Sequence, residues 1–123
     1  MKDRVNEFKA ERNRLQNLMQ EHSGLSTKRF LSLDSQVYRE GVIETKIKEM
    51  MGLVASLVLR CDDCIRYHLD RCYQEGVNEA ELEEVLSIGL VVGGSITIPH
   101  IRRAWDFWEN MISNPENAEH TEK

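Results

Sequence analysis

The chain has 123 residues, the size of one domain, and its 41% hydrophobic and 30% charged residues are ordinary for a soluble globular protein. A net charge of −5 without a basic cluster argues against nucleic acid as the main partner. No apolar run approaches the ~20 residues of a membrane span, and the N-terminal residues lack the hydrophobic region of a signal peptide. We therefore expect a cytoplasmic protein with no membrane partner.

The first two expected helices cover residues 3–22 and 26–40. Many charges leave the first with a narrow apolar stripe, which favours a surface helix over a contact arm in an oligomer. The stripe consists of Val5, Phe8, Leu15, Leu18 and Met19. We expect Gly24 to be the C′ residue of the first helix, Ser26 to cap the second, and Gly41 to end it. The inner face of the second helix should be formed by Phe30, Leu33, Val37 and Tyr38.

The third expected helix, residues 44–59, is the most apolar and should be central. Its inward residues are Ile47, Met50, Met51, Val54, Leu57 and Val58. Glu49 lies inside this helix, where a surface carboxylate is the ordinary interpretation, because glutamate is seldom fully buried. The pattern breaks over residues 60–63, and a reversal there would fold the third and fourth helices side by side, with Glu49 and His68 facing each other. A fourth helix then runs to about Gln74, capped by one of the two aspartates at positions 62 and 63 and closed by Gly76.

The last two expected helices flank a glycine turn at residues 93–94. Asn78 and Glu81 resemble a capping box that opens the fifth helix, whose inward residues are Leu82, Val85, Leu86, Ile88 and Leu90. Residues 95–98 are expected to be a loop or a helix start. Pro99 suits the first turn of the sixth helix, 99–112, whose inward residues are Ile101, Ala104, Trp105, Trp108 and Met111. Residues 114–123 should be a disordered polar tail. The whole chain, 1–123, is expected to be a single all-α domain of about six helices.

Two cysteines and a histidine form the most informative short stretch of the chain. On a helix, Cys61, Cys64 and His68 share a face, and the i, i+3 Cα separation of about 5 Å suits a disulfide. A close cysteine pair in the cytoplasm favours a redox or metal-binding role over a structural one. The helix N-terminus favours a thiolate, but Asp62 and Asp63 oppose it by a similar amount. The thiol therefore needs a basic partner, and His68, one turn after Cys64, is placed to bond its sulfur.

Zinc binding is the main chemical alternative for these residues. Cys72 falls on the same helical face, but it lies eleven residues after Cys61, about 16 Å along a helix, so one ion cannot bind both. A site made of Cys61, Cys64, His68 and Glu49 remains open. Cys72 is also too far from Cys64 for a disulfide, so we expect it to stay free as a small core residue.

A family resemblance rests on Glu49, Cys61, Cys64 and His68 at these spacings, on the lead-in over residues 41–56, and on the later pair of glycines. Over residues 26–109 the chain resembles the AhpD-like alkylhydroperoxidases, also called the carboxymuconolactone decarboxylase family. The resemblance implies an AhpD-like helical bundle and a thiol-dependent peroxidase or disulfide reductase. It also implies that Cys64 attacks a peroxide, Cys61 resolves the product to a disulfide, His68 takes the proton, and Glu49 orients or neutralises His68, with or without a bridging water.

The resemblance also carries expectations about partners. It implies a small peroxide substrate, an external dithiol reductant and no metal, flavin or haem. Together with the limited core of so short a chain, it favours a homo-oligomer built from trimers, up to a hexamer. The peroxidase branch is expected to have a histidine where this chain has Asp63, which favours simple two-cysteine redox activity over an adaptor-linked role. The alternatives are a carboxymuconolactone-decarboxylase-like lyase, whose members typically lack the paired cysteines, and a non-catalytic oligomeric binding protein.

Overall fold

A computed structural model describes residues 3–114, and in that range the chain forms α-helices and one short 3₁₀ helix, without a strand. The elements are α1 (Arg4–His22), α2 (Leu25–Val37), α3 (Thr45–Val58), α4 (Asp62–Gln74), α5 (Glu79–Gly93), η1 (Ser95–Thr97) and α6 (Ile98–Ser113). The expected all-α fold is confirmed. The tail expected over residues 114–123 lies, apart from Asn114, outside the described residues.

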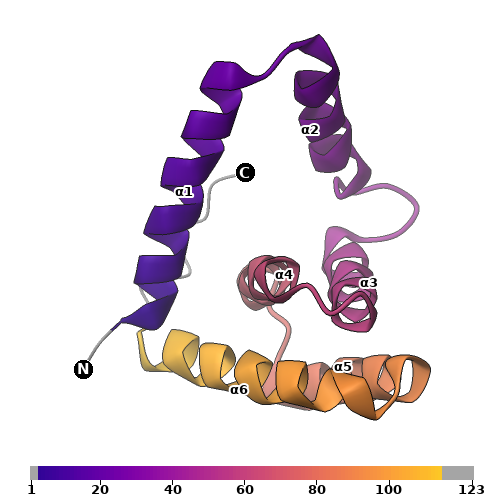
Figure 1. Ribbon diagram of the computed structural model, residues 1–123. Helices are drawn as coiled ribbons and strands as arrows, with labels where there is room; N and C mark the ends of the chain where they lie inside the picture. Colours follow the sequence, from indigo (N-terminus) through magenta and orange to yellow (C-terminus); the bar gives the residue numbers. More distant parts are fainter. Residues whose placement is uncertain (1–2, 115–123) are drawn as a thin grey trace.

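Helix α4 lies in the middle of the molecule and is seen end-on in Figure 1, between α1 and α3. It packs against α3 and α6, while α3 also packs against α5 and the start of α1 packs against α6. Where these helices meet, the side chains of Leu53, Leu57, Ile65, Leu69 and Trp108 are almost completely buried. Burying each such side chain stabilises the fold by roughly 1.5–3 kcal/mol, so this α3–α6 core holds α4 in place.

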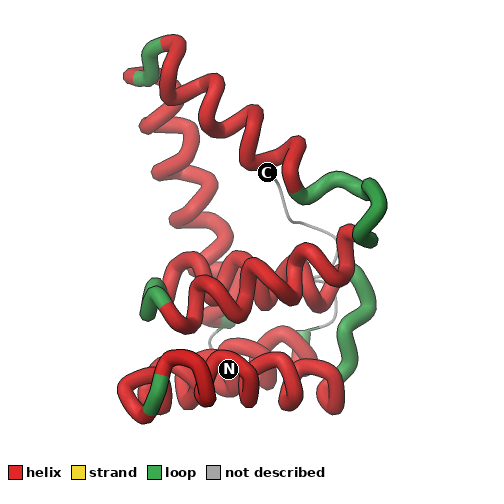
Figure 2. Tube along the Cα trace, turned by 90° about the vertical axis from the view of Figure 1, so that its right-hand side faces the viewer, coloured by secondary structure: helices red, strands yellow, loops and turns green. Residues whose placement is uncertain are grey.

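Helix α2 stands apart from the other helices, and the expectation that it has a buried inner face was wrong. Phe30, Leu33 and Val37 are 68%, 57% and 55% exposed, and no residue of α2 is buried. Figure 2 shows α1 and α2 projecting away from the remaining helices. The helical period of the sequence correctly marks one apolar face, but nothing else in the described part of the chain covers that face.

Other predicted core residues also lie outside the core. Within the predicted apolar stripe of α1, Val5 is buried and Phe8 packs against the core, while Leu15, Leu18 and Met19 are exposed. On α3 and α5 the exposed ones are Ile47, Met51 and Ile88. Helix α3 is therefore central on one face only, because α4 and α5 cover one side of it.

Several helix ends differ from the expected ones. Gly24 has a φ of −84° and forms the N-cap of α2, so it is not a left-handed C′ residue and Ser26 is not the cap. Helix α2 ends at Val37, before Gly41 is reached. The expected capping box is confirmed, since Asn78 Oδ1 accepts from the Glu81 amide at 2.8 Å and Glu81 Oε1 accepts from the Asn78 amide at 3.0 Å.

A buried ion pair fastens α1 to α4. Lys9 Nζ lies 3.0 Å from Asp70 Oδ1, and the two side chains are 10% and 5% exposed. The side-chain amide of Gln74 also donates to Asp70. Near the start of α1, the Val5 amide donates to Asn110 Oδ1 on α6 at 3.1 Å. These contacts hold the first half of α1 against α4 and α6, although many of its residues are charged.

Candidate redox site

The turn between α3 and α4 brings distant residues together. Arg60 has a φ of +60°, the left-handed conformation, and its amide donates to the Leu57 carbonyl at 3.0 Å. The next amide, that of Cys61, donates back to the Ser56 carbonyl at 3.1 Å. The chain reverses here, so the break expected at residues 60–63 is confirmed, and α3 and α4 lie side by side.

Cys61 and Cys64 lie at the start of α4 and are joined by a disulfide, with their Cα atoms 5.3 Å apart. Cys61 is the N-cap of α4, and its sulfur accepts a hydrogen bond from the Cys64 amide at 3.3 Å. The expectation that Asp62 or Asp63 caps this helix was therefore wrong, and Cys61 precedes the helix rather than sharing its face. Cys64 is exposed and Cys61 half-buried, so solvent reaches the bond on the Cys64 side.

The third cysteine, Cys72, is free and completely buried on α4. Burial, and next the negative charge of Glu49, raise the pKa of its thiol to about 12. Since the thiolate is the reactive form, Cys72 is chemically inert near neutral pH. Its expected role as a small core residue is confirmed.

Glu49 and His68 meet between α3 and α4. Glu49 Oε1 lies 2.8 Å from His68 Nδ1, and Glu49 is fully buried, which contradicts the surface position that glutamate usually takes. His68 is 9% exposed. A carboxylate bonded to one ring nitrogen fixes the orientation of the imidazole and leaves the other nitrogen for proton transfer. The expected facing of these two side chains across the helix pair is confirmed.

The second oxygen of Glu49 faces Arg71. Arg71 Nε lies 3.7 Å from Glu49 Oε2, too far for a hydrogen bond, and neither atom has a hydrogen-bond partner among the described residues. Both side chains line a cavity of about 530 Å³. This cavity is large enough for water, which bonds such buried polar atoms in many proteins. Arg71 also places a positive charge beside the buried carboxylate, and sequence reasoning missed this partner.

Two tyrosine rings enclose His68. Tyr38 and Tyr67 have ring centroids 5.3 and 5.2 Å from the imidazole centroid. Burial, followed by the charge of Glu49, raises the pKa of both hydroxyls, so both rings are neutral near pH 7. Gly52 makes this packing possible, because a Cβ there would lie 2.7 Å from His68 Cε1 and 2.7 Å from Tyr38 Oη.

His68 does not bond the cysteine pair in this structure. Among residues 3–114, no hydrogen bond joins its ring to the sulfur of Cys64 or of Cys61, in contrast to the expectation from their spacing. The reason is that Nδ1 of the ring is turned to Glu49, while both sulfurs are bonded to each other. The oxidised form therefore holds the disulfide and the Glu49–His68 pair as two separate units.

Asp62, between the two cysteines in sequence, is bound by α6. Its Oδ1 lies 2.8 Å from His100 Nδ1, and its Oδ2 accepts from Arg103 Nε at 3.0 Å. Partial burial raises the pKa of Asp62. The hydrogen bond from His100 and the charge of Arg103 lower it by more, so the pKa of Asp62 lies below its ordinary value. Asp63, by contrast, is 86% exposed, with Arg66 Nη1 3.9 Å away. Sequence reasoning missed His100 and Arg103, because nothing in the spacing links α6 to this turn.

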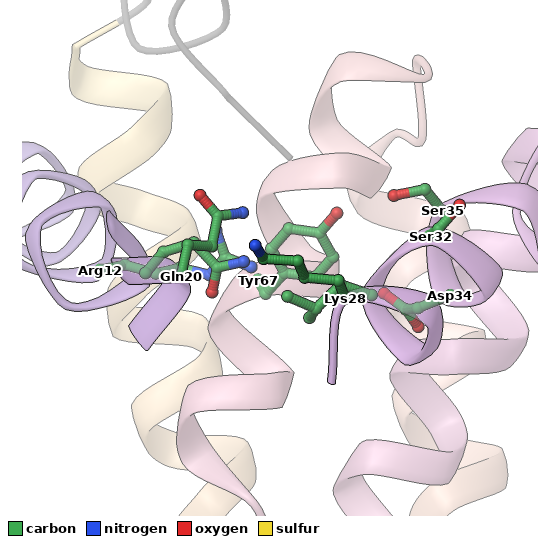
Figure 3. A pocket seen from close by; sticks show the side chains of 9 residues that line it. Arg12, Gln20, Lys28, Ser32, Asp34, Ser35 and Tyr67 are labelled. Carbon is green, nitrogen blue, oxygen red and sulfur yellow. The ribbon is translucent and has the colours of Figure 1, made fainter. Parts of the chain in front are cut away.

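A polar cavity of about 490 Å³ lies between α1 and α2 and reaches Tyr67 on α4. In Figure 3, Arg12 and Gln20 lie on one side of the cavity and Ser32, Asp34 and Ser35 on the other, with Lys28 overlapping Tyr67 between them. The guanidinium of Arg12 lies 4.3 Å from the centre of the Tyr67 ring. Neither cysteine of the pair lines this cavity, so it adjoins the candidate site only through Tyr67.

The described residues hold no group of three or more histidine, cysteine, aspartate or glutamate side chains arranged to bind a metal ion. Cys61 and Cys64 bond each other, and Glu49 bonds His68, so the set considered for zinc is engaged internally. None of the described helices is long and apolar enough to cross a membrane.

Comparisons with known proteins bear on this arrangement. The sequence profile of the carboxymuconolactone decarboxylase family matches residues 25–107. A crystal structure of TM1620 from Thermotoga maritima is 55% identical in sequence, superposes with a TM-score of 0.87, and matches over 90% of this chain and 97% of the other. No curated protein matches this chain.

Two further crystal structures extend the comparison. A second structure of TM1620, at 55% identity and a TM-score of 0.85, covers 93% of this chain and 97% of the other. It is described as a carboxymuconolactone decarboxylase family protein with a possible role in antioxidative response. The apo form of lpg0406, a protein of the same family from Legionella pneumophila, is 18% identical with a TM-score of 0.79, over 88% of this chain and 96% of the other, which shows a shared fold alone.

Proposed function

This chain belongs to the carboxymuconolactone decarboxylase family, and we propose that within it the protein is a thiol-dependent peroxidase or disulfide reductase. The observation that carries the proposal is the disulfide between Cys61 and the exposed Cys64, one helical turn before the buried Glu49–His68 pair. A closable dithiol and a proton carrier thus lie on the same short segment. The possible antioxidative role given for TM1620, 55% identical to this chain, supports the same chemistry.

The proposed reaction begins with the pair reduced. His68 takes the proton of the Cys64 thiol, and the thiolate attacks the outer oxygen of a hydroperoxide. The O–O bond breaks, Cys64 becomes a sulfenic acid, and the leaving alkoxide takes a proton from the imidazolium to form an alcohol. Cys61 then attacks the Cys64 sulfur, a water molecule leaves, and the disulfide seen here forms. Two thiols have been oxidised, and one peroxide has been reduced to alcohol and water.

Each residue of the site has one role in this scheme. Cys64 is the attacking residue because it is the exposed member of the pair, whereas Cys61 resolves the sulfenic acid. Glu49 orients the imidazole through its 2.8 Å contact and stabilises the imidazolium that forms. The direct contact makes a bridging water unnecessary at this position. Arg71, beside the second oxygen, offsets the charge of the buried carboxylate.

Turnover needs partners that return the pair to its reduced form. An external dithiol attacks the disulfide, two electrons pass to Cys61 and Cys64, and the partner leaves as its own disulfide. The scheme uses no metal, flavin or haem. The scheme suits the cytoplasm, where such reductants act. We propose separately that the protein is a homo-oligomer, either a trimer or a hexamer.

The test is cysteine mapping by mass spectrometry, before and after one equivalent of peroxide is added to the reduced protein. We expect a Cys61–Cys64 disulfide, a trapped sulfenic acid at Cys64 in Cys61→Ser, and no reaction in Cys64→Ser. Cys72→Ala is the matched control, because it removes a thiol outside the pair. Thiols that stay reduced in excess peroxide, or a bridge that includes Cys72, would overturn the proposal. Decarboxylation of a carboxymuconolactone by such an inert protein would favour the lyase alternative.

A further inference from the structure

A three-residue cluster ties the first turn of α4 to α6, and we call it the Asp62 clamp. It consists of Asp62, His100 and Arg103. Asp62 directly follows Cys61 and begins α4, while His100 and Arg103 lie one turn apart on α6. The side chains of Asp62 and His100 are 32% and 17% exposed, so the contact is partly shielded from solvent.

The geometry of the clamp decides which atom carries the proton. His100 Nδ1 lies 2.8 Å from Asp62 Oδ1 and 3.2 Å from Arg103 Nη2. A bare nitrogen at 2.8 Å would face the carboxylate lone pairs, so Nδ1 must carry a hydrogen and donate it to Asp62. The same nitrogen cannot accept from Arg103, whose bond is the one from Nε to the other oxygen. In the clamp, His100 and Arg103 thus each donate one hydrogen bond to the carboxylate of Asp62. His100 Nδ1 remains a donor whether the ring is neutral or protonated.

The clamp changes the charge beside the cysteine pair. A free carboxylate at position 62 would oppose a thiolate on either neighbouring cysteine. With Arg103 bound to Asp62, the net charge of the three side chains is zero when His100 is neutral and +1 when His100 is protonated. Arg60 directly precedes Cys61 in the turn and is exposed. A cavity that includes Asp63 and Arg103 is lined by further charged side chains: Arg4, Glu7, Glu11, Arg66 and Asp106. Arg4 pairs with Asp106 at 3.0 Å, Arg14 pairs with Glu11 at 2.8 Å, and Asp63 lies near Arg66. The Asp62 clamp differs from these pairs because Asp62 itself adjoins Cys61.

We propose that His100 and Arg103 are positioning residues for the cysteine pair. By binding Asp62 they hold the first turn of α4 and cancel a charge that opposes the thiolate, and protonation of His100 makes the reactivity of Cys64 depend on pH. This inference rests on the proposed redox function and adds to it a second histidine, on another helix, which takes no part in the Glu49–His68 contact.

The experiment measures the alkylation rate of Cys64 in the reduced protein by iodoacetamide, from pH 5.5 to 8.5, with the modified residue identified by mass mapping. The variants are Arg103→Gln and His100→Gln, each alone and in an Asp62→Asn background. Arg102→Gln is the matched control, because Arg102 is an exposed arginine beside Arg103 on α6. Circular dichroism checks that each variant keeps its helices.

We expect Arg103→Gln to slow alkylation about threefold to tenfold at all pH values, the effect of one unpaired charge near a partly exposed thiol. Adding Asp62→Asn should restore the rate, because the carboxylate that Arg103 balances is then gone. For His100→Gln, the ratio of wild-type to variant rate should rise as the pH is lowered across this range. Arg102→Gln should change the rate less than twofold.

Two outcomes would overturn the inference: a His100→Gln ratio that stays constant with pH, or an Arg103→Gln defect that Asp62→Asn does not relieve. A purely structural role for Arg103 gives the second result, since removing Asp62 as well cannot repair a lost contact. Alkylation reports thiol ionisation rather than peroxide turnover. It therefore tests the clamp even if peroxide leaves the pair unchanged, and the two proposals fail separately.

Discussion

Glu49 and His68, nineteen residues apart in the chain, are joined by a 2.8 Å contact in the interior between α3 and α4. Glu49 is inaccessible to solvent, and a carboxylate is buried at a large cost unless it is paired. Its two oxygens face His68 and Arg71, both on α4. Packing of α3 against α4 would not require a buried carboxylate. Its position beside the imidazole of His68, one turn after Cys64, therefore indicates a role for the pair beyond packing.

The first prediction concerns proton transfer from Cys64. His68→Ala should slow oxidation of Cys64 by peroxide about 10²–10⁴-fold at neutral pH, the usual effect of losing a general base. Glu49→Gln should do less harm, because the amide still contacts the ring but cannot stabilise its charged form. Asp63→Asn should have little effect or speed the reaction slightly, since that carboxylate is exposed. The measurement is the stopped-flow rate of Cys64 oxidation against pH.

The control for these variants is the alkaline end of the same profile. Above the thiol pKa Cys64 needs no base, so wild type and His68→Ala should converge there. If His68→Ala reacts as fast as wild type at neutral pH, the relay is wrong and another group activates the thiol.

The second prediction uses the close approach of Gly52 to the site. Gly52→Ala should displace His68 or Tyr38, because the new Cβ would lie 2.7 Å from atoms of both rings. Oxidation of Cys64 should then slow while the protein stays folded, as a single methyl group overpacking a core costs about 1–3 kcal/mol. Gly24→Ala is the matched control, since a Cβ there has no neighbour within 4 Å. Equal rates for the two variants would mean that the ring positions do not matter.

The local part of the fold could be predicted from the sequence, and the contacts between distant elements could not. Apolar spacing located all six helices, and the Asn78–Glu81 box marked one helix start to the residue. Periodicity shows that a helix has an apolar face but does not show what covers it. Phe30 and Leu33 therefore looked like core residues although they are exposed. The spacing within α1 likewise gives no sign that Lys9 is buried, because its partner Asp70 lies on another helix.

The same limit applies to the site. The cysteines, His68 and Glu49 stood out because their spacings match a family pattern, and the break at residues 60–63 correctly suggested that α3 and α4 lie side by side. Arg71, His100 and Arg103 carry no such pattern. Only the packing of α6 against α4 brings the last two to Asp62.

The third prediction concerns Cys72. Its thiol should resist iodoacetamide in the native protein at pH 8 and react in denaturant, because burial raises its pKa to about 12. The unfolded-state pKa is near 8.5, so the folded protein holds this proton more tightly. Its contribution to the free energy of unfolding is therefore complete below about pH 8.5 and is lost as the pH rises toward about 12. Cys72→Ala should flatten that alkaline decline, and an unchanged decline would assign it to other groups.

The fourth prediction concerns the ion pair between α1 and α4. Lys9→Met should lower the free energy of unfolding by about 3–5 kcal/mol, because it leaves the carboxylate of Asp70 buried without its cation. Adding Asp70→Leu should recover much of this loss, since two apolar side chains replace a costly pair. Urea unfolding at one protein concentration measures both variants. Arg14→Met is the control: its pair with Glu11 is exposed, so a comparable loss there would show that burial is not the cause.

The fifth prediction concerns assembly, and it follows from the apolar residues that α2 presents to solvent. Leu25, Phe30, Leu33 and Val37 are each more than half exposed, and α2 has no buried residue. Phe30, Leu33 and Val37 follow one another at i, i+3 and i+7, so they share one face of α2, and an exposed apolar patch often marks an interaction site. Light scattering should therefore give a mass three or six times the 14.3 kDa of one chain at micromolar concentration. A stable species of one chain's mass would refute it.

Charge placed on that face should separate the chains without unfolding them. Phe30→Asp combined with Leu33→Asp buries a carboxylate in any interface that α2 forms, so the mass should fall toward that of one chain. The helical content should persist, because no α2 side chain contributes to the core. Ser32→Asp puts the same charge on α2 at a position that does not face the side of Phe30 and Leu33, and it should leave the mass unchanged. If the double variant keeps the wild-type mass, the chains associate through another surface, and the exposed residues of α3 and α5 become the next to test.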